Sequence, residues 1–315
     1  MKITYNNVEV IVPDTIIVGA AKSGTTSLFN YLTNHPHIFA PHEKEPWFFS
    51  FKDEYPDFIH PVTGRKNPKT IISNINDYLE LFKNASNQHC IEGSTSYLYT
   101  AEKTIKNIRE IYGELYKKLN IIIILRNPIE RAWSHYTMHL RDNQTNLSFE
   151  NSIKKKTIET RLAQRSTIGY DYIGFGKYYK QVKIFKETFN RVKIILYDDF
   201  CSQPQSSISS IFSFIGLKDY EVNIKSRFNI SGIPKNKAMN YASRFIKKPS
   251  MFKGLFMKIF SESLIVYLRN KLNNLLYKRK QLPPQIRESL ISQYKDEIYL
   301  LEKLINRDLR NWLKN

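Results

Sequence analysis

Cysteine is scarce in this chain of 315 residues, and the two present, Cys90 and Cys201, have no C-x-x-C partner. Two thiols cannot build a disulfide framework, so a reducing compartment is the simpler expectation. Long apolar runs are also missing, because the most apolar one, IIIIL at 121–125, has the length of a strand. The first residues, MKITYNNVEVIVPD, lack the apolar core of a signal peptide. These absences favour a cytoplasmic protein.

Acidic residues are few: 29 Asp and Glu stand against 48 Lys and Arg, for a formal net charge of +19. Such an excess favours an anionic ligand, nucleic acid or a membrane surface as partner, although a generally lysine-rich composition would also produce it. The aromatic residues form no recognisable motif for RNA or single-stranded DNA. We therefore expect no nucleic-acid partner.

The excess of positive charge is greatest between residues 244 and 280, where ten cations accompany one acid, Glu262. Aromatic and aliphatic side chains lie between the cations. A basic amphipathic segment can lie on an anionic membrane or hold an acidic polymer. The alternative is an ordinary pair of helices with a solvated basic face. The first interpretation predicts peripheral contact with the inner face of the membrane.

Short apolar runs alternate with helical patterns along the chain. Strands are expected at 15–19, 89–93, 120–126 and 191–197, and helices at about 25–32, 101–117, 128–141 and 204–215. This order predicts an α/β fold, a parallel β-sheet flanked by helices on both faces, in a single domain over 1–315. We expect a core over about 13–237, a basic helical segment over about 240–282 and a C-terminal packing helix over about 283–313.

One loop, within TIIVGAAKSGTTSLFNYL at 15–32, has the character of an anion site. Gly19 and Gly24 have the spacing of the Walker loop G-x-x-x-x-G-K-[ST], but the only lysine, Lys22, lies inside the loop. A strand that runs into a helix aims free backbone N–H groups at an anion. Thr25, Thr26 and Ser27 add hydroxyl groups, and Ser23 is also assigned to the binding loop. The loop therefore predicts an oxyanion site that needs no metal.

Two further stretches accompany this loop, KEPWFFS at 44–50 and ILRNPIERAWSHY at 124–136. In the latter an arginine ends a strand and a serine follows eight residues later. Together the three resemble the motifs of the sulfotransferases that use 3′-phosphoadenosine 5′-phosphosulfate (PAPS), especially the heparan-type glycan sulfotransferases and their bacterial relatives. The resemblance is strong over about residues 15–140 and fainter to about 237. It implies a P-loop sulfotransferase with PAPS as co-substrate and no metal.

The resemblance also implies roles at the reaction centre. Lys22 would contact the bridging oxygen and the sulfonate of PAPS, where a cation stabilises the charge that develops on the leaving 5′-phosphate. Glu45 would be the general base that takes the proton of the acceptor hydroxyl during in-line attack. Glu43 is a nearby rival, but it falls outside the motif.

The remaining nucleotide contacts follow from the same resemblance. Arg126 and Ser134 would bind the 3′-phosphate, which a guanidinium can grip with two hydrogen bonds. The alternative for Arg126 is a structural salt bridge with Glu130. Tyr197 would lie against the adenine, unless it is a core residue at the end of a strand. Lys235 or Lys237, in the late stretch FNISGIPKNK, would reach the 3′-phosphate, unless these lysines are simply solvated.

Some positions depart from the pattern or fail as sites. Gly93 stands where heparan-type relatives place a lysine after a glutamate, which puts the transfer of substrate geometry in doubt. Trp47 replaces a common histidine and could offer a stacking surface to a sugar beside the base. His135 and His139 have the i, i+4 spacing of a zinc pair, but no third ligand accompanies them, so we expect helix histidines.

The resulting hypothesis is an enzyme that transfers the sulfonate of PAPS to a hydroxyl of a glycan or glycolipid, such as a lipid-linked sugar. A lipid or small-molecule acceptor is the first alternative. A P-loop kinase or NTPase is the second, but the loop has no lysine after Gly24 and the strand IIIILR ends in arginine instead of a carboxylate. A nucleotide-binding module without catalysis would follow only if the assignment of Glu45 is wrong.

Overall fold

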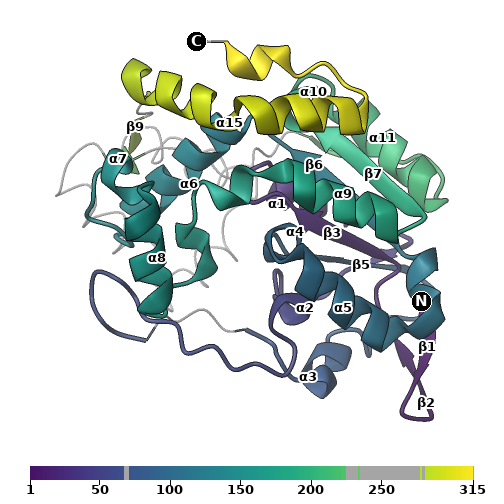
Figure 1. Ribbon diagram of the computed structural model, residues 1–315. Coiled ribbons are helices and arrows are strands. Elements are labelled where there is room, and N and C mark those ends of the chain that lie inside the picture. The colour runs from purple at the N-terminus through teal and green to yellow at the C-terminus, as the bar shows by residue number, and fades with distance from the viewer. Residues whose placement is uncertain (67–70, 225–232, 235–276, 279–280, 315) are drawn as a thin grey trace, which may run out of the picture.

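Five parallel strands form the central sheet of this computed structural model, which describes residues 1–66, 71–224, 233–234, 277–278 and 281–314. The strand order is β4-β5-β3-β6-β7. The strands are β3 (Thr15–Gly19), β4 (Ile38–Phe39), β5 (His89–Gly93), β6 (Asn120–Leu125) and β7 (Arg191–Leu196). Consecutive strands are joined through helices that cover the sheet (Figure 1).

Helices lie on both faces of the sheet. One face is covered by α5 (Ala101–Tyr112), α9 (Tyr178–Thr188) and α15 (Pro284–Ile305). The other face is covered by α1 (Thr25–Leu32) and α11 (Pro204–Ile215). This confirms the predicted α/β fold with a parallel sheet between two helical layers.

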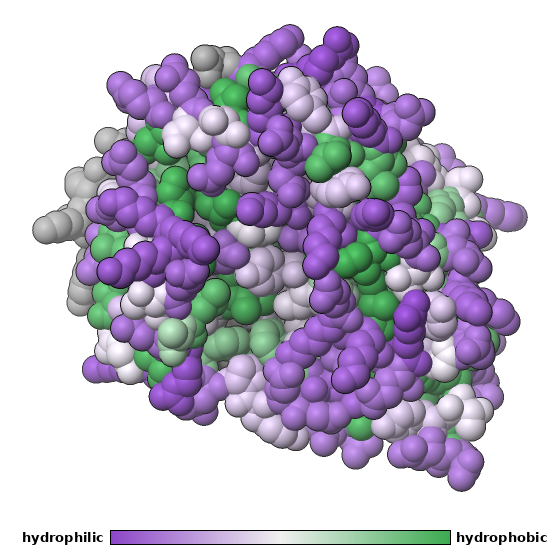
Figure 2. All heavy atoms as spheres, in the orientation of Figure 1, coloured by the Kyte–Doolittle hydropathy of each residue, from purple (hydrophilic) through white to green (hydrophobic). Residues whose placement is uncertain are grey.

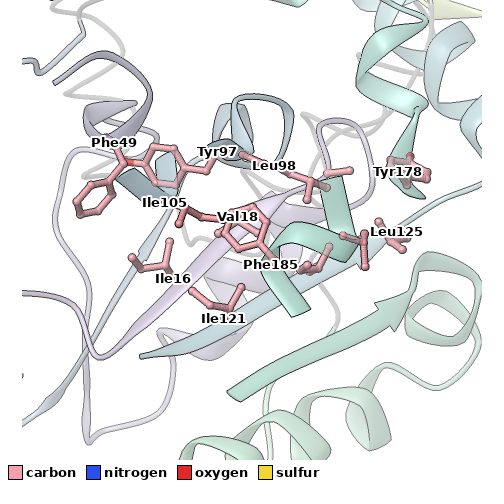
Figure 3. Close-up of a cluster of buried hydrophobic side chains, with 14 of the residues drawn as sticks. Ile16, Val18, Phe49, Tyr97, Leu98, Ile105, Ile121, Leu125, Tyr178 and Phe185 are labelled. Carbon is pink, nitrogen blue, oxygen red and sulfur yellow. The ribbon is translucent and has the colours of Figure 1, made fainter. Parts of the chain in front are cut away.

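The strand sequences explain why both faces are covered. In β3, Ile16 and Val18 join the cluster that contains Ile105 and Phe185, whereas Ile17 joins the cluster on the opposite face. Figure 3 shows the first of these clusters, with strand and helix side chains interleaved. Because successive side chains of a strand point to opposite faces, a strand apolar at every position must be buried on both.

The other elements extend this core. An N-terminal hairpin consists of β1 (Lys2–Tyr5) and β2 (Val8–Ile11), and β8 (Ile233–Pro234) pairs with β9 (Tyr277–Lys278). The remaining helices of the described residues are α2 (Phe48–Phe51), α3 (Ile75–Glu80), α4 (Ser96–Tyr99), α6 (Pro128–Arg141), α7 (Phe149–Ser152), α8 (Lys155–Ala163) and α10 (Tyr197–Ser202). Short 3₁₀ turns are η1 (Gly113–Lys118), η2 (Ile168–Tyr170), η3 (Gly174–Gly176) and η4 (Arg310–Leu313).

Element bounds follow the sequence closely, with four differences, and the sheet strand β4 was not expected. The strand expected at 120–126 ends at Leu125. The helix expected at 101–117 changes to a 3₁₀ turn after Tyr112, and Tyr197 begins α10 instead of ending β7. The C-terminal packing helix expected over about 283–313 is shorter, because α15 ends at Ile305 and Asn306 takes a left-handed φ of 51°. Trp312 is nevertheless buried, through η4. The basic segment at 240–282 lies almost wholly outside the described residues.

Candidate active site

The anion loop lies between β3 and α1, at the carboxyl edge of the parallel sheet. This edge is where open α/β sheets bind ligands. Gly24 ends the loop with a left-handed φ of 87°. A Cβ at this position would lie 3.0 Å from the ring of Tyr197, so the backbone and the ring are in close contact. Glycine is required here by both the backbone angle and the packing.

The loop has the donors that an oxyanion needs. Ser23 is fully buried, and its hydroxyl makes no well-formed hydrogen bond with a described residue. The Tyr178 hydroxyl beside it donates to the Arg126 carbonyl (3.0 Å). Thr25 and Thr26 begin α1, whose first N–H groups have no acceptor within the helix. A buried hydroxyl and a free helix end together fit a bound phosphate or sulfonate.

Lys22 lies within this loop with its ammonium group against α6. Its Nζ is 3.2 Å from Met138 Sδ. The pKa of Lys22 is lowered from the ordinary 10.5 to about 8, first by burial and then by the positive charges of Arg141 and Arg126. The carboxylate of Glu45 acts in the opposite direction. Lys22 is therefore still mainly charged at neutral pH, in surroundings that favour an anion beside it.

Arg126 follows β6 and touches the loop from the side. Its Nη1 donates to the Lys22 carbonyl (3.1 Å), and its guanidinium carbon is 4.8 Å from the centre of the Tyr197 ring. The salt bridge with Glu130, considered as an alternative, does not form, because Glu130 pairs with Arg287. The structure therefore brings Arg126 and Tyr197 to the anion loop.

Ser134 lies in the middle of α6 and is buried. Met138 is one turn further along the same face, and Arg141 follows after nearly another turn. Since Met138 touches Lys22, this face of α6 runs along the anion loop. Arg141 also forms a two-pronged pair with Asp142, with both contacts at 2.9 Å.

Glu45 approaches from the segment before α2. Its Oε2 accepts hydrogen bonds from Thr95 Oγ1 (3.4 Å) and Trp47 Nε1 (3.5 Å). Its negative charge acts to raise the pKa of both Lys22 and Lys44, against the effect of burial. The rival Glu43 is exposed. The structure thus brings Glu45, from a segment distant in sequence, to the lysine of the anion loop.

The structure also shows the surroundings of Trp47 and Gly93, the two positions that depart from the family motif. Trp47 is only 8% exposed and stacks on Phe51 (ring centres 5.9 Å apart), so its ring face is not an open platform for a sugar. A Cβ at Gly93 would lie 3.3 Å from the ring of Phe29. The cation beside that ring is Lys44, whose Nζ is 5.7 Å from the ring centre and whose pKa is lowered by burial.

The histidine pair of α6 is part of the core. His139 Nδ1 is 2.7 Å from the hydroxyl of Tyr172, and His135 Nδ1 is 3.2 Å from Arg131. Burial lowers the pKa of both rings, to about 3 for His139, so both are neutral at physiological pH. In the part of the chain that the structure describes, no three His, Cys, Asp or Glu side chains are grouped to hold a metal.

Sequence reasoning missed several residues at this site. Met138 and Arg141 could have been found from the helical spacing that begins at Ser134. No local signal points to Thr95, which donates to Glu45, or to Ser94, which accepts from the Trp47 N–H. Lys235, expected near the 3′-phosphate, lies outside the described residues. No described helix is long and apolar enough to cross a membrane.

Known proteins are similar to this chain in sequence and in fold. Residues 13–221 match the Sulfotransferase family. Human heparan sulfate glucosamine 3-O-sulfotransferase 3B1 is 25% identical over 240 residues, covering 74% of this chain and 53% of the human protein. The chain therefore spans about half the length of that relative. The membrane-associated sulfotransferase kil1 of Dictyostelium discoideum is 29% identical over 124 residues, covering 39% of this chain and 22% of that protein.

A solved structure agrees over nearly the whole chain. The sulfotransferase from Alicyclobacillus acidocaldarius superposes with a TM-score of 0.70 at 28% identity, covering 97% of this chain and 100% of that one. The family match includes the anion loop, the segment of Glu45 and α6. Sequence and fold together confirm the resemblance: the chain belongs to the Sulfotransferase family.

Proposed function

We propose that this protein is a PAPS-dependent sulfotransferase that transfers a sulfonate to a hydroxyl of a glycan or glycolipid. The observation that carries the proposal is the meeting of Lys22, Arg126 and Glu45 at one edge of the sheet. Two cations and a buried hydroxyl suit a donor that has two anionic groups, and a carboxylate beside them suits an acceptor that must lose a proton.

The residues present fit the donor. The loop residues Lys22, Ser23, Gly24, Thr25, Thr26 and Ser27 would hold the 5′-phosphosulfate. Arg126 and Ser134 would hold the 3′-phosphate, and Tyr197 would lie against the adenine; Lys235 is proposed as a further 3′-phosphate contact on sequence alone. The buried, unpaired hydroxyl of Ser23 supports this assignment, because a buried polar group without a partner is costly until an anion accepts from it.

PAPS, when bound, would supply the activated sulfonate. Lys22 would keep positive charge beside the oxygen that leaves with the 5′-phosphate. Glu45 would accept the acceptor's hydroxyl proton while the new oxygen–sulfur bond forms and the bond to the leaving phosphate breaks. The hydrogen bonds from Thr95 and Trp47 would orient the Glu45 carboxylate for this transfer. The proposal needs no metal.

The glycan acceptor rests on similarity to proteins named for it. The human relative is named for heparan sulfate glucosamine, and the Dictyostelium relative is named membrane-associated. The word membrane-associated supports a proposed peripheral contact with the inner membrane face, where a lipid-linked sugar would be met. The cytoplasmic location is proposed on the sequence alone. A lipid or a small molecule is the alternative acceptor.

The donor can be tested by melting curves with four additions: the product 3′-phosphoadenosine 5′-phosphate (PAP), AMP, ATP with Mg²⁺, and a short DNA strand. We expect PAP to raise the melting temperature without metal and AMP to do so much less, because only PAP has a 3′-phosphate. Greater stabilisation by ATP with Mg²⁺ would favour a kinase or NTPase. Labelled PAPS with glycan and lipid extracts of the host would then identify the acceptor.

A further inference from the structure

A buried carboxyl group lies beneath the segment that carries Glu45. Glu92, near the end of β5, is fully buried. Its oxygens accept hydrogen bonds from Ser94 Oγ (2.8 Å) and from the Tyr78 hydroxyl (3.4 Å), and the Tyr97 hydroxyl is a third partner. No cation pairs with it within the described residues.

The surroundings of Glu92 favour the uncharged acid. Burial raises the pKa of this carboxyl from 4.5 to about 8, although its hydroxyl partners favour the charged form. The ionisable groups that face it are Tyr78 on α3, Tyr97 on α4, Tyr112 on α5 and Glu45. None of these four can supply a positive charge, so only the hydroxyl hydrogen bonds offset the cost of burying the carboxylate, and they do so in part.

Two of the hydroxyl partners also hold the segment of the base. Ser94 Oγ accepts from the Trp47 N–H (3.1 Å), and the Tyr97 hydroxyl accepts from the Phe49 N–H (3.3 Å). Glu45 and Trp47 both take left-handed φ angles, 57° and 59°. Such angles are unfavourable for residues other than glycine, so the surrounding bonds must hold this backbone in place.

We propose that Glu92 is a positioning residue that fixes the Glu45 carboxylate through Ser94 and Tyr97. The inference rests on the proposed function, in which Glu45 is the base. A neutral Glu92 can accept from Ser94 without placing a second buried negative charge close to Glu45. Its ionisation would add that charge in a medium of low dielectric and disturb the hydrogen bonds that hold the loop.

The first test removes the link and leaves both carboxylates in place. We expect Ser94→Ala to lower kcat about 10- to 100-fold, the effect of a small misplacement of a reacting group, with little change in KM for PAPS or in PAP affinity. Ser96→Ala is the matched control, because Ser96 is equally buried and its hydroxyl bonds to Ser50 instead of to residues 45–47. We expect this control to keep the wild-type kcat.

The second test uses the pH dependence of kcat at saturating PAPS, where the bound anion keeps Lys22 charged. We expect the wild-type kcat to fall as pH rises through about 8, because Glu92 then loses its proton. Glu92→Gln, which cannot ionise, should keep its kcat to higher pH. Glu92→Leu, which cannot accept from Ser94, should lose kcat at every pH, so the glutamine variant would show rescue by a neutral acceptor.

Wild-type kcat in Ser94→Ala, together with an unshifted pH profile in Glu92→Gln, would overturn this inference. If Glu45→Gln were inactive in the same assay, the proposed function would still stand. If Glu45→Gln instead transferred sulfonate at the wild-type rate, the assignment of the base would fail, and this inference would fail with it. Melting curves of each variant would separate loss of positioning from loss of the fold.

Discussion

Lys22 is charged in surroundings that make its charge costly. It is enclosed by the loop and α6, and after burial the largest effects on its pKa come from the guanidinium groups of Arg141 and Arg126. Its pKa of about 8 records that cost. An anion bound beside it would remove much of the repulsion and raise the pKa again.

This predicts a pH-dependent affinity for PAP. Since binding raises the pKa of Lys22, the contribution of Lys22 to affinity should be constant well below pH 8, where this residue is already protonated in the free protein. It should fall as pH rises through about 8. Calorimetry near that pH, in two buffers of different ionisation enthalpy, should show proton uptake on binding. Lys22→Met should bind PAP more weakly and lose both effects. An affinity that is equally pH-dependent in this variant would remove Lys22 from the nucleotide site.

Glu45 and Glu43 are two residues apart but differ in environment. Glu45→Gln should keep PAP affinity and lose transfer by about 10²- to 10⁴-fold, the usual contribution of a general base. Glu43→Gln is the matched control and should retain activity, because Glu43 is exposed. Steady-state kinetics and PAP calorimetry on both variants are the measurement. The reverse pattern would transfer the base role to Glu43.

At the scale of elements, the site is made where a loop, a helix and two strand ends meet. α6 begins at Pro128, and the Asn127 side chain accepts from the Ile129 N–H (3.0 Å) to cap it. The helix then runs along the anion loop, where Met138 touches Lys22. The loop is thus supported on one side by α6 and on another by the ring of Tyr197.

Arg126→Ala should weaken PAP binding by about 1.5–3 kcal/mol, the range for hydrogen bonds to charged groups, and should weaken AMP binding much less. Arg287→Ala is a suitable control, because it also removes an arginine beside α6 but one that pairs with Glu130. Calorimetry with both nucleotides gives the comparison. Equal losses for PAP and AMP would mean that Arg126 acts only through its bond to the Lys22 carbonyl.

At the scale of the whole molecule, the described surface gives a mostly hydrophilic face with hydrophobic residues in small patches (Figure 2). The net charge of +19 is concentrated in sequence at 244–280, which lies almost entirely outside the described residues. We retain the proposal that this segment brings the enzyme to an anionic surface or polymer. Each basic residue near an anionic leaflet contributes about 1 kcal/mol, and salt screens the attraction.

Co-sedimentation with vesicles tests this proposal. We expect binding to anionic vesicles at low salt, less at high salt and little to neutral vesicles, with acidic polysaccharide as a second arm. Neutralising Lys247, Lys248 and Lys253 with glutamine should reduce binding, whereas the same change at the exposed residues Lys154, Lys155 and Lys156 should not. Equal effects of the two triple variants, or no salt dependence, would leave the segment as an ordinary solvated face.

The sequence by itself determined four of the five strands of the sheet and the location of the anion loop. β3 and α1 have the bounds expected from TIIVG and TTSLFNYL, and α6 has those expected from Pro128 and Arg141. These are local properties, since strand burial, helix capping and glycine spacing are set by neighbours in the chain. The motifs could therefore assign the family before any contact was known.

Only the tertiary structure decided which distant residues meet at the site. Lys22 lies against Met138 and not only against its own loop, and Glu130 pairs with Arg287 and not with Arg126. No sequence pattern specified these pairs, because each joins segments more than a hundred residues apart or chooses among several cations. These pairs form because α6 and α15 pack on the sheet and bring the side chains together. A buried charge is stable only beside a suitable partner, so the packing decides which pairs form.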